Sequence, residues 1–108
     1  MLSDLSIRRL IMPGKYKEDP LRYVLNWAYH QAMTGKGRER HAEDKPFVDQ
    51  IWHSIRKVVG SGFTLGQVLK KADEAQRMTR EQAIRELLGV INYTAMEIIA
   101  IIEAGDKP

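Results

Sequence analysis

The stretch "TREQAIRELLGVINYTAMEIIAII", residues 79–102, decides the fold, because it carries a long and regular helical pattern. Thr79 and Gln82, three residues apart, form a capping box, which is a signal for the start of a helix. Apolar residues then recur at spacings of three and four, as they do on one face of a helix. The predicted core stripe consists of Ile84, Leu87, Leu88, Ile91, Ala95, Ile98 and Ile102.

The opposite face of this helix is not purely polar. It carries Met96 and Ala100 beside Tyr93, and it also contains Gly89. A glycine inside a helix costs about 1 kcal/mol relative to alanine, and such a position often marks a close approach by another group. We therefore expect another subunit or a ligand to lie against this face, which predicts a homo-oligomer.

Three shorter helical patterns precede it. Pro20 behind Asp19 opens the first, which ends before Gly35, and residues 46–59 form the second, which ends at "GSG". Thr64 is the predicted N-cap of the third. The predicted core residues of the three are Leu21, Val24, Leu25, Ala28, Phe47, Ile51, Ile55, Val58, Leu65, Val68, Leu69 and Ala72. No segment alternates apolar and polar residues as a strand does. The sequence therefore predicts an all-α fold, an antiparallel four-helix bundle.

Length and composition set the broad class. The chain has 108 residues, of which 44% are hydrophobic and 29% charged, and it divides into an N-terminal arm, 1–18, and one domain, 19–104. It has no cysteine, which excludes disulfides and favours an intracellular, cytoplasmic location. No apolar run is expected to span a membrane. A net charge of +3 favours small anionic partners over nucleic acid.

Two polar stretches are candidates for binding an anion. In "GQVLKKADEAQ", residues 66–76, a helical wheel groups Gln67, Lys70, Lys71 and Glu74 opposite the apolar stripe. This group is either a solvated surface or a phosphate site, because lysine binds phosphate as a compact point charge. The loop "GKGRERHAEDKP", residues 35–46, adds the basic residues Arg38, Arg40, His41 and Lys45.

Other side chains extend this candidate site. Tyr93 lies one turn from Gly89 and is a candidate for stacking on a base, and Asn92 offers an amide to a base edge or a sugar. Glu86 is a third candidate for a base or sugar contact. The three histidines lack the paired spacing of a zinc site, so no metal site is predicted.

The segment "LGQVLKKADEAQRMTREQAIRELLGVINYTAMEIIAII" resembles the core of the MazG-like, all-α nucleoside triphosphate pyrophosphohydrolases. That family carries an EExxE element and a later ExxD element whose carboxylates hold magnesium. Lys70, Lys71 and Glu74 occupy the EExxE positions, and Glu86 and Gly89 the ExxD positions, so two of five carboxylates remain. Two lysines repel the metal and attract phosphate directly. The stretches "ERHAEDKPF", "GFTLGQ" and "RELLGVINY" also resemble a group of short phage-encoded proteins.

Three functions follow as hypotheses. The first is non-catalytic binding of a phosphorylated nucleotide or nucleotide-derived signal, as in a phage anti-defence protein that sequesters a messenger in the infected cell, without a cofactor. The second is a magnesium-dependent MazG-like pyrophosphohydrolase that uses carboxylates among Asp44, Asp49, Asp73, Glu74, Glu81 and Glu86. The third is a helical module that binds nucleic acid or protein through the basic loop.

Overall fold

The computed structural model describes residues 18–34 and 46–105. In this part the chain is all-helical and contains no strand, which confirms the all-α class. The elements in chain order are α2 (Pro20–Met33), a short 3₁₀ helix η3 (Phe47–Asp49), α4 (Ile51–Val59), α5 (Ser61–Ala75) and α6 (Arg80–Ala104). The predicted arm, residues 1–18, lies almost entirely outside the described residues, as does the basic loop.

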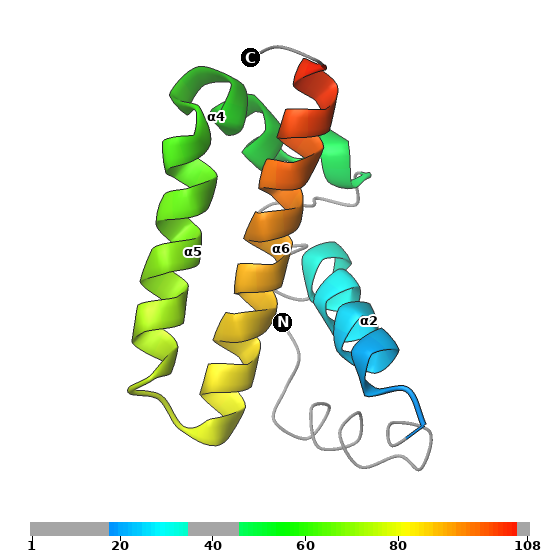
Figure 1. Ribbon diagram of the computed structural model, residues 1–108, viewed down its shortest axis with the longest axis vertical. Helices are drawn as coiled ribbons and strands as arrows, with labels where there is room; N and C mark the ends of the chain where they lie inside the picture. The colour runs from blue at the N-terminus through cyan, green and yellow to red at the C-terminus, as the bar shows by residue number, and fades with distance from the viewer. Residues whose placement is uncertain (1–17, 35–45, 106–108) are drawn as a thin grey trace.

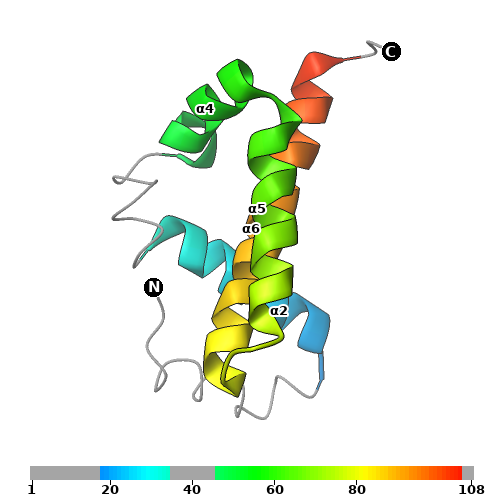
Figure 2. The same ribbon diagram turned by 90° about the vertical axis from the view of Figure 1, so that its left-hand side faces the viewer.

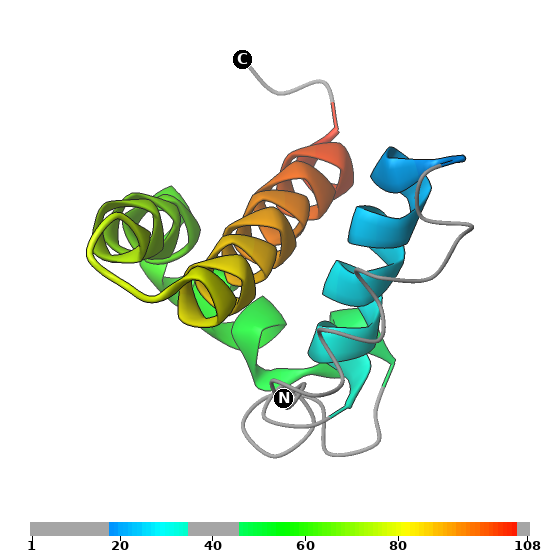
Figure 3. The same cartoon turned by 90° about the horizontal axis from the view of Figure 1, so that it is seen from below.

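The long helices α5 and α6 form an antiparallel hairpin, and the other two helices pack around it (Figure 1). Viewed along the hairpin, α5 and α2 lie on opposite sides of α6 (Figure 3). The short helix α4 crosses the end of the hairpin where α6 finishes, while α2 lies beside the other half of α6 (Figure 2). The central helix therefore has two covered sides.

Local signals in the sequence locate two of the helix starts. Asp19 accepts a hydrogen bond from the backbone N–H of Arg22 at 3.3 Å, directly before Pro20. The predicted capping box is also present, because Thr79 accepts from the Gln82 backbone and the Gln82 side chain accepts from the Thr79 backbone. Both predictions are confirmed, since these bonds satisfy N–H groups that a helix leaves without internal partners.

The corner between α4 and α5 differs from the prediction. Gly60 alone joins the two helices, with φ of 87°, and α5 already begins at Ser61. The predicted N-cap role of Thr64 is wrong, because Thr64 lies inside α5 with its side chain buried. The predicted helix 46–59 is likewise divided, because the backbone of Gln50 is extended between η3 and α4.

Two small hydrophobic clusters form the core of the described residues. Between α2 and α6, Trp27 and Ala28 pack on Leu88. Between α4, α5 and α6, Trp52 packs with Tyr93 and Met96, and the indole of Trp52 donates a 2.7 Å hydrogen bond to the carbonyl of Phe47. The hairpin is thus fastened to its neighbours at two separate places.

The predicted core stripes are only partly covered. Leu88 is buried as expected, whereas nine predicted core residues are exposed: Leu21, Leu25, Ile51, Val58, Leu65, Leu69, Leu87, Ile98 and Ile102. The reason is that α6 turns its other face toward α5, so that Tyr93 and Met96 are 9% and 4% exposed. The prediction that another copy of the chain covers Gly89, Tyr93 and Met96 is wrong, because α4 and α5 of the same chain pack there, while the homo-oligomer itself stays a prediction.

Helix α6 is long and apolar enough, by length and composition alone, to cross a membrane. The expectation that no run reaches this length is therefore wrong, because the capping box at Thr79 starts a helix that continues without interruption for 25 residues. A single helix of this kind is a weak indication of a span, because core helices pass the same test.

Candidate functional site

Lys71 lies on the seam between α5 and α6, and it brings three residues of the predicted site together. Its ammonium Nζ is 3.6 Å from Oε2 of Glu86 and 5.9 Å from the centre of the Tyr93 ring. Lys71 and Glu86 each keep 25% of their side chain exposed. The nearest carboxylate oxygen is farther than a charge-assisted hydrogen bond of about 2.8 Å, so the pair is loose and reachable from solvent.

Gly89 is the position that lets Lys71 reach this place. A Cβ atom on Gly89 would lie 3.2 Å from Cδ of Lys71 and 3.4 Å from Cε. The predicted close approach at this glycine is therefore confirmed, but the approaching group differs from the prediction. It is the aliphatic stem of Lys71 from the same chain.

Tyr93 is buried beside this ion pair. Its ring meets that of Phe63 edge to face, with 5.8 Å between the ring centres. The interpretation that Tyr93 lies on a face away from the core is wrong, because its neighbours in the second core cluster include Trp52 and Met96. Stacking of Tyr93 on a base stays a prediction, and it requires the α5–α6 seam to open.

The other residues of the α5 group have different surroundings. Lys70 is exposed next to Lys71, while Gln67 and Glu74 are half-buried. One turn further along, Arg77 donates to Asp73 with a shortest distance of 2.6 Å. This hydrogen bond and the positive charge of Arg77 lower the pKa of Asp73. Lys71 is thus the member of the predicted lysine pair that lies inside the seam, and Lys70 is exposed.

Asn92 faces a different part of the molecule. Its amide Nδ2 donates a 2.9 Å hydrogen bond to the carbonyl of Ala28 on α2. Asn92 therefore joins α6 to α2, on the opposite side of α6 from Lys71. Its predicted contact with a base or a sugar would have to break this bond. The remaining predicted anion-binding residues, Arg38, Arg40, His41 and Lys45, lie outside the described residues.

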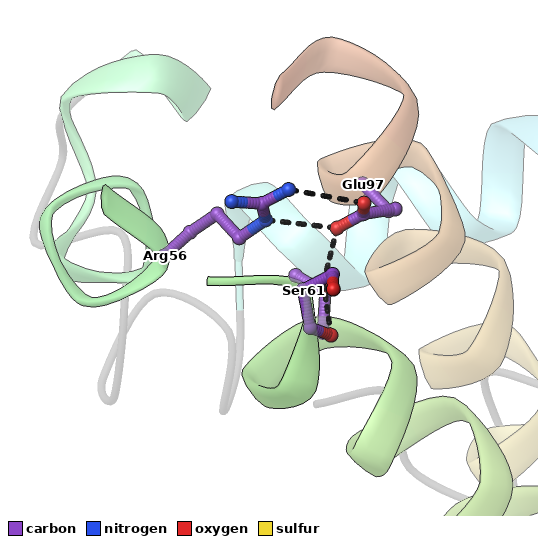
Figure 4. Close-up of polar contacts among 4 residues, drawn as sticks. Arg56, Ser61 and Glu97 are labelled. Carbon is purple, nitrogen blue, oxygen red and sulfur yellow. Dashed lines mark hydrogen bonds and ion pairs between the residues drawn. The ribbon is translucent and has the colours of Figure 1, made fainter. Parts of the chain in front are cut away.

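A second polar cluster, which sequence reasoning missed, joins α4, α5 and α6. Arg56 donates from Nε and Nη2 to the two carboxylate oxygens of Glu97, at 2.8 and 3.0 Å (Figure 4). The hydroxyl of Thr64 donates to Oε1 of the same carboxylate and also lies 3.2 Å from the carbonyl of Ser61. Glu97 is 8% exposed, so this is a buried carboxylate with three donors.

The environment of Glu97 shifts both charged groups toward their ionised forms. The hydrogen bond from Arg56 is the main cause that lowers the pKa of Glu97, against an opposing effect of burial, and Thr64 adds to the lowering. The same hydrogen bond raises the pKa of Arg56. In the sequence Arg56 is one turn from Trp52 and Glu97 is one turn from Tyr93, but the burial of Tyr93 that would mark the pair is seen only in the structure.

Of the carboxylates proposed for the hydrolase alternative, Asp44 lies outside the described residues, and the described ones are not gathered into a metal site. Asp73 binds Arg77 and Glu86 faces Lys71. Across residues 18–34 and 46–105, no group of three His, Asp or Glu side chains is close enough to hold a metal ion. The chemistry that the described site offers is the binding of anions by lysine. No protein-family model, curated protein or solved structure matches this chain.

Proposed function

We propose that this chain binds a phosphorylated nucleotide or a nucleotide-derived signal without hydrolysing it, as a cytoplasmic homo-oligomer. The observation that carries the proposal is the loose contact of Lys71 with Glu86, 3.6 Å apart and partly exposed, beside the second cation Lys70. Lys71 is the cation of this contact, and Lys70, the residue before it in the chain, is an exposed second positive charge. A partly exposed ion pair contributes about 0 to 1 kcal/mol and is readily exchanged for a stronger partner.

Phosphate is the partner that this arrangement favours. Its oxygens accept charge-assisted hydrogen bonds of about 2.7 to 2.9 Å, which are shorter and stronger than the contact of Lys71 with Glu86. A phosphate on Lys71 would release the Glu86 carboxylate, which then accepts hydrogen bonds from sugar hydroxyls. Glu86 thereby keeps the role in sugar recognition that its position in the sequence predicts.

The proposal also covers the origin of the protein and its role in the cell. The resemblance to short phage-encoded proteins supports an anti-defence function, in which the protein sequesters a messenger of an infected bacterial host. The resemblance to MazG-like enzymes supports a closed antiparallel four-helix bundle that once met phosphates through magnesium. Lysines in place of two acids support binding and release instead of hydrolysis.

The test first identifies any ligand that the purified protein retains and then measures the binding of nucleotides. Native mass spectrometry of protein purified from phage-challenged cells reports the mass of any bound nucleotide and its stoichiometry. Binding of mono-, di- and triphosphate nucleotides and of cyclic dinucleotides is then measured by calorimetry, with and without magnesium. Pyrophosphate release that needs magnesium and disappears in Glu86→Gln would establish the hydrolase instead. Binding to long nucleic acids alone, with strong salt dependence, would establish the third function.

A further inference from the structure

The outward side of α6 is an apolar surface without charge. Leu87, Ile98, Ile101 and Ile102 are 46%, 52%, 58% and 70% exposed, and we call these four residues the outer face of α6. They share one side of the helix, because Leu87, Ile101 and Ile102 are 11, 3 and 4 residues from Ile98 and so lie within about 60° of its direction at 100° per residue.

Charged residues are absent from this face. From Leu87 to Ile102, Glu97 is the one charged residue in the sequence, and its carboxylate points away to Arg56. Thr94 is exposed in the interval between Leu87 and Ile98, and its hydroxyl donates to the carbonyl of Val90. The outer face of α6 is therefore uncharged along about four helical turns, with exposed apolar side chains at both ends and Thr94 between them.

The neighbouring helices leave this face open within the described residues. Helix α2 packs on Leu88 and reaches Asn92, and the orange-to-red half of α6 continues past it (Figure 1). Helix α4 covers the side of that half which carries Glu97. Of the long stretch of α6 that is apolar enough to enter a membrane, 17% is buried.

The chain buries little apolar surface elsewhere. Seven hydrophobic residues are buried in the described ranges, among them Trp52, Trp27 and Leu88. Small domains have little core to spare, and stable monomers seldom expose a large continuous apolar patch. The amphipathic pattern in the sequence marks Leu87, Ile98 and Ile102 as core, so these residues are expected to be covered in the folded protein.

We infer that a second copy of this chain covers the outer face of α6, so that two α6 helices pack against each other across a twofold axis. A second copy of the chain is available wherever the protein is made, so it can bind the outer face of α6. The absence of charge allows the face to meet itself without opposing like charges, as a self-complementary interface requires. The inference does not depend on nucleotide binding.

A lipid bilayer is the competing occupant, and the neighbours of α6 disfavour it. Spanning would carry the buried Arg56–Glu97 ion pair into hydrocarbon. It would also place α5 in the bilayer, because α5 packs antiparallel to α6, and α5 exposes Lys70 and Asp73. Charged side chains inside a bilayer are costly, so the geometry favours a protein partner.

Light scattering of the parent chain is the first test. At about 50 µM we expect a particle mass of at least twice the 12.4 kDa of one chain. On dilution the particle mass should fall toward that of one chain. Ile98→Glu places two carboxylates in the interface, and it should raise the concentration for half-association about a hundredfold or more. Gln76→Glu, an exposed polar position at the end of α5, should match the parent. A monomeric parent at this concentration, or an Ile98→Glu variant that associates like the parent, overturns the inference.

Crosslinking tests the same contact without relying on a variant that must fold as a monomer. The chain has no cysteine, so Thr94→Cys and Gln76→Cys each carry a single thiol. A flexible bismaleimide should link Thr94→Cys into a covalent dimer and leave Gln76→Cys mostly unlinked. Equal yields, or no dimer from Thr94→Cys, would overturn the inference. So would a parent that is monomeric in solution and sediments with vesicles of phosphatidylcholine and phosphatidylglycerol, because the bilayer would then be the occupant.

Discussion

Arg56 on α4 and Glu97 on α6 form a two-point ion pair, 2.8 Å from Nε to Oε1 and 3.0 Å from Nη2 to Oε2. The two residues are 41 positions apart in the chain, so their contact fastens the short helix α4 to the long helix α6. Helix α4 has nine residues and is joined to α5 through Gly60 alone, and this pair therefore fixes its direction.

Removing one member of this ion pair should lower the free energy of unfolding more than removing both members. Arg56→Met leaves the Glu97 carboxylate mostly buried with Thr64 as its remaining side-chain donor, and we expect a loss of about 2 kcal/mol in the free energy of unfolding. The double variant Arg56→Met, Glu97→Leu should recover most of that loss. Urea unfolding at pH 7 measures both. Asp73→Asn, which removes the exposed pair with Arg77, is the control and should leave the midpoint nearly unchanged. A double variant as unstable as the single one would contradict this account.

The same carboxylate predicts a dependence of stability on pH. The hydrogen bond from Arg56 lowers the pKa of Glu97 in the folded state below its unfolded value of about 4.3. Such a group stabilises the fold fully above the unfolded pKa, and this contribution is lost as the pH falls through the lower, folded pKa. The difference in unfolding free energy between the parent and Glu97→Gln should therefore be largest near pH 7 and shrink below about pH 4. Urea titrations at several pH values test it, and a difference that stays constant down to pH 3 would refute the assignment.

Gly89→Ala should stabilise the fold slightly. The added Cβ would meet Cδ of Lys71 at 3.2 Å, and this atom belongs to a flexible side chain that has room to shift by a few tenths of an ångström. Alanine is better than glycine inside a helix by about 1 kcal/mol, so we expect a net gain of several tenths of a kcal/mol. Gly89→Leu should instead push Lys71 off the seam and lower both stability and nucleotide affinity. Melting temperatures and calorimetry separate these effects.

The two lysines should contribute to ligand affinity through charge. Lys71→Met keeps the aliphatic stem against Gly89 and removes the ammonium, and Lys70→Glu reverses the exposed charge. Loss of one charge-assisted hydrogen bond weakens binding by about 1.5 to 3 kcal/mol, or roughly ten- to a hundredfold. Lys57→Glu is the control with the same change of charge as Lys70→Glu, and Asn92→Ala should lower stability by about 1 kcal/mol with unchanged affinity. Unchanged binding in both lysine variants would show that the pair is ordinary surface.

The sequence predicts the helices well because their signals are local. Asp19 with Pro20 and Thr79 with Gln82 satisfy backbone groups within their own first turns, so no distant partner is needed to recognise them. Thr64 shows the limit of such reasoning. It has the chemistry of an N-cap, but its hydroxyl bonds Glu97, which lies 33 residues further along the chain.

The faces of the helices are harder to predict. Periodicity groups Leu65 with Leu69 and Lys71 with Glu74, but it does not say which group meets the neighbouring helix. Helix α6 meets a side of α5 that carries both Val68 and Lys71, with Lys71 packed against Gly89. That choice depends on the fit of two particular side chains, and a hydrophobic pattern does not contain this information.

The turn between α5 and α6 also bears on how the chain folds. Four residues, 76–79, connect the two longest helices, so these helices meet by closing a short loop. Contacts of this kind form quickly, because little chain entropy is lost in closing a short loop. The α5–α6 hairpin is therefore the expected folding nucleus. Helix α2, which docks later through Trp27 and the amide of Asn92, should exchange its backbone hydrogens before α6 does.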